Sequence, residues 1–281
     1  MSKRIDLLCV AKNENLTIKD WVNYHLNMGF NRIWIVDNND VEDVSLIDTL
    51  NDELATERVF IINNFKGAKT FQLKAYNAFI NYFSERNMYD WIGIIDCDEY
   101  FDYNHEKYKS LSEYFETVEE KCPNITGLFV NWQVYDDNGQ YYYKNEPVVE
   151  RFPNPADRKI PFWNGDDENT HIKSFIRGKG QYIGNPHNCV TTGKTYSADF
   201  KELNPFSPWN SDYSFDNAKI KHYVTKSLEE FIMRKMGAIC ADNENNKPYN
   251  LEYYWRVNKK TDEALKALAD LKEKYKLENV E

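Results

Sequence analysis

The sequence predicts an α/β protein with a Rossmann-like, mostly parallel sheet that is flanked by helices. Two observations predict this class. Four short, nearly continuous apolar segments occur in the first third of the chain, and their β-branched content suits strands that are buried on both faces. Amphipathic segments with helical spacing separate them, and this alternation is typical of a parallel sheet. The expected strands are residues 5–10, 32–37, 58–63 and 91–96.

Three helices are expected between these strands, because apolar side chains recur there at intervals of three and four residues. The first helix is expected to end at Gly29, since glycine readily adopts the left-handed conformation of a helix C-terminus. The expected helices are residues 16–28, 43–55 and 70–86.

The alternation stops after residue 102, where the chain becomes rich in Asn, Gly, Pro and aromatic residues. We expect loops and a small antiparallel sheet here, attached to the same core and followed by helices. The expected strands are residues 127–135, 148–152, 172–178 and 181–184, and the expected helices are residues 110–121, 225–241 and 261–277. The predicted organisation is therefore one domain over residues 1–241 and a C-terminal helical extension over residues 242–281.

The composition argues against several classes of protein. A net charge of −10 leaves no basic stripe to neutralise a nucleic-acid backbone, so no nucleic-acid partner is expected. No apolar stretch approaches the roughly 18 residues of a membrane span, and the short apolar run near the N-terminus lacks the features of a signal peptide. The five cysteines are scattered without a CxxC pair, which favours reduced thiols over a zinc site. We expect a cytoplasmic protein without a transmembrane segment, and peripheral membrane association stays open.

A cluster of carboxylates follows the fourth predicted strand, in the segment IIDCDEYFD at residues 94–102. Carboxylates so close together repel one another, and their burial is costly unless a cation or hydrogen bonds compensate. If the segment is extended, Asp96 and Asp98 project to the same side and can share one Mn²⁺ or Mg²⁺ ion. The alternative is that these side chains point into water at the end of a strand.

Polar residues also follow the other three predicted strands, in AKNEN at 11–15, DNND at 37–40 and NN at 63–64. The carboxyl ends of parallel strands meet at one edge of a sheet, where open α/β folds bind their ligands. Each segment taken alone is equally well explained as turn capping by Asp and Asn. No glycine-rich phosphate loop is present, so a metal ion would have to take its part in binding a phosphate.

The segments CVAKNE, IVDNND and DCDEYFD, in this order, resemble those of GT-A glycosyltransferases, and most closely the branch related to families 2 and 92. The resemblance covers about residues 5–235 and includes VNWQVY, VVERF, IKSFIRG, NPHN and IKHYVTKSLEEF. It departs from the family at DDNGQ (136–140), where relatives often carry small residues. This departure leaves the acceptor unassigned.

The resemblance implies roles for individual residues. Asp37 would contact the base or the ribose, and Asp96 would face the ribose and the metal. Asp98 would bind the metal directly, with His222 as a further ligand, although the residues alone favour an ordinary histidine at a strand end for position 222. The implied nucleotide-sugar-binding residues are Ala11, Asn13, Glu14, Asp37, Gln72, Tyr76, Asn77 and Asp96.

These roles imply a metal-dependent glycosyltransferase that moves a sugar from a nucleoside diphosphate donor, with UDP as the expected nucleotide, to a glycan or glycolipid acceptor. Residues 1–102 would bind the donor, and residues 103–241 would face the acceptor. The resemblance favours inversion, in which a carboxylate deprotonates the attacking hydroxyl. The candidate bases are Glu150, which ranks first, and Asp166, Asp167 and Glu168. Asp136 and Asp137 rank lower, because relatives often lack acids there.

Two alternatives stay open. A nucleotidyltransferase that makes a sugar nucleotide can use a similar sheet, but it normally needs a glycine-rich, basic loop, and CVAKNENLT contains no glycine. The second alternative is a non-catalytic carbohydrate-binding protein of the same fold. Such a protein would have no need to keep Asp96, Asp98 and His222 together.

Overall fold

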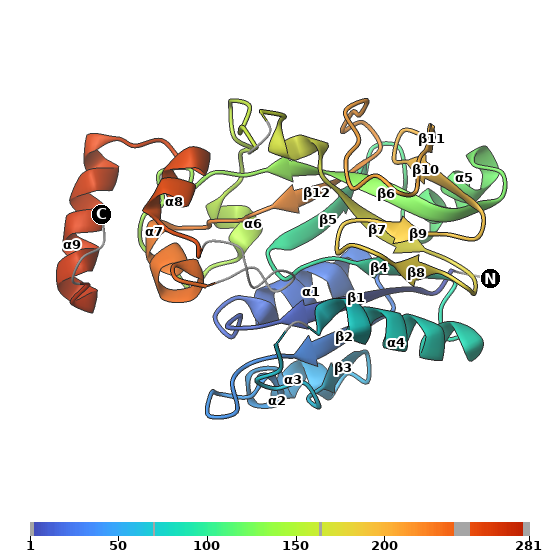
Figure 1. Ribbon diagram of the computed structural model, residues 1–281, viewed down its shortest axis with the longest axis horizontal. Coiled ribbons are helices and arrows are strands. Elements are labelled where there is room, and N and C mark those ends of the chain that lie inside the picture. The colour runs from blue at the N-terminus through green and yellow to red at the C-terminus, as the bar shows by residue number, and fades with distance from the viewer. Residues whose placement is uncertain (1–2, 70, 163–164, 239–247, 278–281) are drawn as a thin grey trace.

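The structure, a computed structural model, describes residues 3–69, 71–162, 165–238 and 248–277. Its central sheet has ten strands and is flanked by helices (Figure 1). In chain order these strands are β1 (Ile5–Ala11), β2 (Arg32–Asp37), β3 (Val59–Ile62), β4 (Trp91–Ile94), β5 (Glu99–Tyr103), β6 (Ile125–Val134), β7 (Ile172–Ile176), β10 (Lys194–Ser197), β11 (Glu202–Leu203) and β12 (Ala218–His222). A separate antiparallel pair consists of β8 (Tyr182–Ile183) and β9 (Cys189–Val190).

The strand order is β11-β10-β6-β7-β4-β1-β2-β3, and β12 pairs with both β5 and β6. Every pair among β1, β2, β3 and β4 is parallel. Strand β7 runs antiparallel to its neighbours β4 and β6, so its first residues lie at the edge where β4 ends. These pairings confirm the predicted fold class, a mostly parallel sheet with a small antiparallel sheet beside it.

The longer helices of the first half are α1 (Ile18–Met28), α4 (Gln72–Glu85) and α5 (Leu111–Lys121). Successive side chains of β1 pack into different cores, because the side-chain period of a strand is two. Leu7 and Cys9 belong to the core that contains Trp21 of α1, whereas Leu8 belongs to the core that contains Ile80 of α4. A strand buried on both sides in this way has the continuous apolar sequence from which it was predicted.

The helix predicted at 43–55 is divided in the structure. It consists of α2 (Leu46–Thr49) and α3 (Asn51–Leu54), separated by Leu50 with a φ of −107° and a ψ of 23°. Helix α1, in contrast, ends where the sequence predicts, because Gly29 has the left-handed φ of 111°.

The prediction of a strand at 148–152 is wrong, because this segment begins with helix α6 (Val148–Arg151). Val148 and Phe152 are both buried in the main core, four residues apart, as on one face of a helix. The adjacent valines favour a strand by propensity alone, but tertiary packing overrides such preferences. The predicted strands at 127–135, 172–178 and 181–184 are confirmed as β6, β7 and β8.

The helix predicted at 225–241 starts as α7 (Leu228–Glu230) and continues as a π-helical turn, η2 (Phe231–Lys235). Ser227 and Glu230 form a capping box at its start. The cysteines that the structure describes are free and buried, and Cys240 lies outside the described residues.

Helices α8 (Leu251–Val257) and α9 (Asp262–Tyr275) follow, and in Figure 1 they lie at the end of the molecule opposite the N-terminus. They share a small apolar core with α7 and η2, separate from the cores of the sheet. Its fully buried members are Leu228, Phe231, Tyr254 and Leu271. Within the described part of the chain, no helix has both the length and the apolarity to span a bilayer.

Gly93 in β4 lies between two core side chains. A methyl group added to it would lie 2.4 Å from Phe175 and 2.8 Å from Leu7, closer than carbon atoms approach one another. We expect Gly93→Ala to lower the free energy of unfolding by about 1 to 3 kcal/mol, the usual cost of overpacking a core. Urea denaturation of the variant and the wild type measures this difference in the free energy of unfolding. Gly184→Ala is the matched control, since its new methyl group would be 3.7 Å from its nearest neighbour, and equal stability of the two variants would contradict the packing.

Candidate active site

The carboxylate cluster lies in the turn that joins β4 to β5, at the carboxyl end of the parallel strands. Strand β4 ends at Ile94, and the amide of Glu99 donates a hydrogen bond of 3.1 Å to the carbonyl of Asp96. The expectation of an extended segment that presents Asp96 and Asp98 on one side is therefore wrong. The turn gives the two carboxylates different partners.

Lys173, the second residue of β7, binds the first part of the turn. Its Nζ lies 2.6 Å from Asp96 Oδ2 and 3.3 Å from Glu99 Oε2. Burial by itself would lower the pKa of Lys173, but the two carboxylates outweigh burial and raise it. Burial raises the pKa of Glu99 to about 8, although Lys173 opposes this shift. The buried lysine and the raised pKa of Glu99, which favours its neutral form, together explain how Asp96 and Glu99 can lie so close together.

Asp98 is buried among cations from the C-terminal part of the chain. Lys235 Nζ donates a hydrogen bond of 3.1 Å to Asp98 Oδ2, and Arg234 Nη2 lies 3.9 Å from the same oxygen. The other oxygen, Oδ1, lies 3.8 Å from Nε2 of His222. Burial alone would raise the pKa of Asp98, but the surrounding cations, Lys235 first among them, hold it well below its usual range. Asp98 is therefore ionised at neutral pH.

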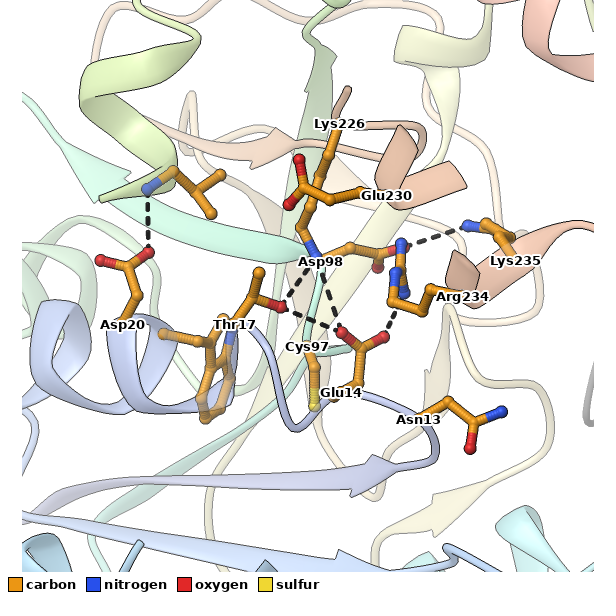
Figure 2. A network of polar contacts seen from close by, with 12 residues as sticks. Asn13, Glu14, Thr17, Asp20, Cys97, Asp98, Lys226, Glu230, Arg234 and Lys235 are labelled. Carbon is orange, nitrogen blue, oxygen red and sulfur yellow. Dashed lines mark hydrogen bonds and ion pairs between the residues drawn. The ribbon is translucent and has the colours of Figure 1, made fainter. Parts of the chain in front are cut away.

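A second buried carboxylate, Glu14, shares Arg234 with Asp98 and also lies near Lys226 (Figure 2). Arg234 Nη1 donates a hydrogen bond to Glu14 Oε1, and Lys226 Nζ lies 3.6 Å from Glu14 Oε2. Lys226 also donates a hydrogen bond of 3.1 Å to the hydroxyl of Thr17. Figure 2 shows Glu14 and Asp98 on two sides of Arg234, so one guanidinium links the end of β1 to the turn after β4.

His222 ends β12 and packs against Trp132 of β6, with ring centroids 4.0 Å apart. His171 and His187 pack against the same indole, at 4.7 and 5.1 Å. Burial lowers the pKa of His222 to about 3 and that of His171 to about 4, so both imidazoles are neutral at pH 7. Nδ1 of His222 has no hydrogen-bond partner among the described residues. Packing against Trp132 therefore fixes the orientation of this imidazole.

Among the described side chains at this edge of the sheet, Asp98 and His222 are the pair best suited to hold a divalent cation. Their Oδ1 and Nε2 atoms are 3.8 Å apart, a separation that two ligands at about 2.1 Å from one ion can span. An ionised carboxylate and a neutral imidazole are also donors that Mn²⁺ accepts. The described residues contain no group of three or more His, Cys, Asp or Glu side chains suited to hold a metal. Most of the coordination positions would therefore be filled by the bound ligand and by water.

Asp37 is buried at the carboxyl end of β2, paired in register with Ala11 of β1. Its Oδ1 accepts a hydrogen bond from Asn39 N at 3.0 Å, and its Oδ2 accepts one from Leu46 N at 3.2 Å. The side chain of Asn39 accepts a further bond from Asn13 N at 2.8 Å. The structure therefore brings Ala11, Asn13 and Asp37 together at one edge, where Asp37 stabilises the backbone around it.

Gln72, Tyr76 and Asn77 all lie on α4. Gln72 Nε2 donates to the Tyr76 hydroxyl at 3.2 Å and lies 3.5 Å from Asp96 Oδ1. Asn77 instead bonds the backbone N–H and carbonyl of Ile183 in β8, at 2.8 and 2.9 Å. Gln72 and Tyr76 therefore lie beside Asp96, whereas the side chain of Asn77 holds β8 against the helix.

Three of the four higher-ranked candidate bases lie toward solvent. Glu150 is exposed on α6, and Asp166 is exposed in the loop before β7. Asp167 is half-buried, and its side chain accepts a hydrogen bond from Asn169 N at the start of the short 3₁₀ helix η1 (Glu168–Thr170). Asp167 therefore stabilises the local turn.

The fourth candidate, Glu168, is buried at the edge of the sheet where β7 begins. One of its oxygens, Oε1, lies 2.5 Å from Arg256 Nη2, and Oε2 has no hydrogen-bond partner among the described residues. Burial raises the pKa of Glu168. Glu168 therefore combines the burial and the raised pKa that are typical of carboxylates in active sites.

Sequence reasoning did not find the buried cations of the site, which are Lys173, Lys226, Arg234 and Lys235. The carboxylate cluster was itself a signal for them, because buried carboxylates need compensating charge. The chain has 35 Lys and Arg residues, however, and no periodicity indicates which of them fold back onto this turn.

A surface hollow elsewhere on the protein is lined by Glu119, Asn124, Arg177 and Gly193. It lies at the end of β7 that pairs with the start of β4, as the Ile92–Ile176 pairing shows. The hollow is thus at the amino end of the parallel strands, away from the carboxylates and their cations.

No protein-family model and no curated protein matches this sequence. Among solved structures, TarS of S. aureus aligns with 47% of this chain and 22% of its own, at 9% identity and a TM-score of 0.32. The mannosyltransferase PcManGT from Pyrobaculum calidifontis, in complex with GDP-Man and Mn²⁺, aligns over 63% of this chain and 45% of its own, at 10% identity and a TM-score of 0.36. TarS 1–349 in complex with UDP aligns over 62% of this chain and 46% of its own, at 8% identity and a TM-score of 0.37. The aligned region spans less than half of each of these chains, and similarity this weak does not assign a function.

The pKa of Glu99 generates a prediction about stability and pH. Because burial raises this pKa from 4.5 to about 8, the folded protein favours the protonated side chain. The contribution of Glu99 to stability is therefore fully present below about pH 4.5 and is lost as the pH rises through about 8. Glu99→Gln, which stays neutral, should lose less unfolding free energy than the wild type between about pH 5 and pH 8. Urea denaturation across this range measures the difference, and parallel curves would show that Glu99 does not titrate there.

Proposed function

We propose that the protein is a metal-dependent GT-A glycosyltransferase that transfers a sugar from a nucleoside diphosphate donor, with UDP as the expected nucleotide, to a glycan or glycolipid acceptor. The observation that most supports this is the pair of Asp98 and His222 at the carboxyl end of the sheet. The ordered segments around Asp37 and Asp96 that resemble this class of enzyme end at the same edge. The resemblance in sequence and the position of these side chains therefore support the same function, that of a glycosyltransferase.

In this proposal, Asp98 and His222 hold Mn²⁺ or Mg²⁺, which as a Lewis acid would stabilise charge on the leaving diphosphate. Asp96 is kept in position by Lys173, and its side chain is 35% exposed, so it can accept hydrogen bonds from a ribose or a sugar. The segment from Ala11 to Asn13 and the loop after Asp37 would bind the nucleoside. Trp132 and its histidines would form an apolar wall beside the metal, of the kind against which sugar rings pack.

For the general base we propose Glu168, ahead of Glu150. A base must remain close to the acceptor hydroxyl, and it works best when its pKa is near the operating pH. Burial raises the pKa of a carboxylate toward that pH. Glu168 is buried at the edge that carries Asp98, and its Oε2 has no hydrogen bond to any residue in the described part of the chain, whereas Glu150 is exposed on α6. Inversion at the anomeric carbon, implied by the sequence resemblance, would follow from a direct attack by the deprotonated hydroxyl.

A panel of nucleotide sugars with and without Mn²⁺ tests the function. We expect one donor to be consumed, and EDTA to abolish its consumption. His222→Ala should weaken Mn²⁺ binding in the presence of the nucleotide by at least about 10- to 100-fold, which is the cost of losing even an outer-shell partner of a metal ligand. His105→Ala is the matched control, because His105 is exposed and pairs with Asp102. Donor consumption that persists unchanged in EDTA would rule out the metal, and no consumption of any donor would rule out the transferase.

The base is tested with isosteric amides. We expect Glu168→Gln to keep Mn²⁺ and nucleotide binding and to lower transfer by about 100-fold or more, the usual contribution of a general base. Glu150→Gln is the matched control and should transfer at the wild-type rate. Rates are expressed per folded molecule, because Glu168 also pairs with Arg256. The reverse pattern, with Glu150→Gln inactive and Glu168→Gln active, would assign the base to Glu150.

A further inference from the structure

We propose that Arg234, together with Lys226 and Lys235, forms a preformed binding site for the diphosphate of the donor. The protein would then bind the diphosphate directly with its own cations, in addition to any metal held by Asp98. This inference rests on the proposed function and adds to it a second means of holding the same ligand.

The guanidinium of Arg234 is buried but incompletely bonded. Its side chain is 8% exposed, and Nη1 donates a hydrogen bond to Glu14. Nε and Nη2 have no hydrogen-bond partner among the described residues, and the nearest carboxylate oxygen to Nη2 is Asp98 Oδ2 at 3.9 Å. These two nitrogens form one edge of the guanidinium, which is the edge that binds two oxygens of a phosphate at once. Because unpaired buried donors are costly, this edge is suited to bind an anion.

The charges around Arg234 favour an anion. The three cations Lys226, Arg234 and Lys235 face two carboxylates, Glu14 and Asp98. A third nearby carboxylate, Glu230, adds no net negative charge, because both of its oxygens bind Arg151, at 2.6 and 2.9 Å. One positive charge is therefore left over at a buried position, where electrostatic attraction is strong.

The backbone that carries these cations is held in uncommon conformations. Lys226 is buried with a left-handed φ of 54°, and Arg234 and Lys235 end the π-helical turn η2. Such features concentrate at functional sites and persist where the surroundings hold them in place. Here the capping box of Ser227 and Glu230 lies between them and fixes the start of the helix.

The position of the cations matches the proposed metal site. Lys235 and the free edge of Arg234 both lie on the Oδ2 side of Asp98, and His222 lies on the Oδ1 side. A diphosphate coordinated to a metal between Asp98 and His222 would thus have Arg234 nearby. Arg234 can take up this ligand through Nε and Nη2 without losing its bond to Glu14.

Inorganic pyrophosphate is the probe for this site, measured by calorimetry on the full chain in EDTA at constant ionic strength. We expect the wild type to bind pyrophosphate, and Arg234→Gln to bind it about 10- to 100-fold more weakly, as for the loss of charged hydrogen bonds. Arg234→Lys keeps the charge that pairs with Glu14 but lacks the two-nitrogen edge, so it should also bind more weakly and provides the test if Arg234→Gln does not fold. Arg86→Gln is the matched control, because Arg86 is exposed and lies over the ring of Tyr82.

Glu14→Gln separates binding from a structural role. Glu14 bonds Nη1 and leaves Nε and Nη2 to the ligand, but its negative charge repels an anion there. Removal of this charge should therefore tighten pyrophosphate binding, whereas a merely structural ion pair predicts no gain. No binding by the wild type, or equal binding by wild type, Arg234→Gln and Arg234→Lys, would overturn the site. If pyrophosphate binds as expected but no nucleotide sugar is consumed, the diphosphate-binding site stands and the transferase falls. If a donor is consumed and its KM is unchanged in Arg234→Lys, the transferase stands and the site falls.

Discussion

The central constraint on this structure is the burial of carboxylates at the end of β4. Asp98 and Glu99 are almost completely buried, and Asp96 is partly buried beside them. Carboxylates in such a position are stable only if cations and hydrogen bonds replace the water that they lose. The chain supplies Lys173 from β7 and Lys235 from η2, so segments distant in sequence must fold onto one turn.

This constraint gives the C-terminal segment a direct part in the site. Arg234 and Lys235 reach Glu14 and Asp98 only because η2 is held over the end of the sheet. The apolar core that η2 shares with α7, α8 and α9 anchors it on one side, and the Arg151–Glu230 pair anchors the start of the helix on the other. The helices at the end of the chain therefore stabilise the site as well as themselves.

Much of the fold could be predicted from local patterns. The four parallel strands were found from their continuous apolarity, and α1 was found from its helical spacing and from Gly29. The failures occurred where local preference and packing disagree. Residues 148–152 have the β-branched content of a strand, but burial of Val148 and Phe152 on one side makes them helical. Strand β5 was missed because its acidic residues conceal a buried strand, in which Glu99 lies beside Lys173 of β7.

Part of the candidate site could likewise be predicted from the sequence, and part could not. The sequence by itself determined that acidic and amide residues gather where β1, β2 and β4 end, because a parallel sheet brings these ends together. Only the tertiary structure decided that Asp96 and Asp98 have separate partners and that both oxygens of Asp37 bind backbone amides. It also decided that Nε and Nη2 of Arg234 have no hydrogen bond to any residue that the structure describes. The physical reason is distance along the chain. Lys235 and Asp98 are 137 positions apart, and no local periodicity encodes an ion pair that depends on the path of the whole chain between them.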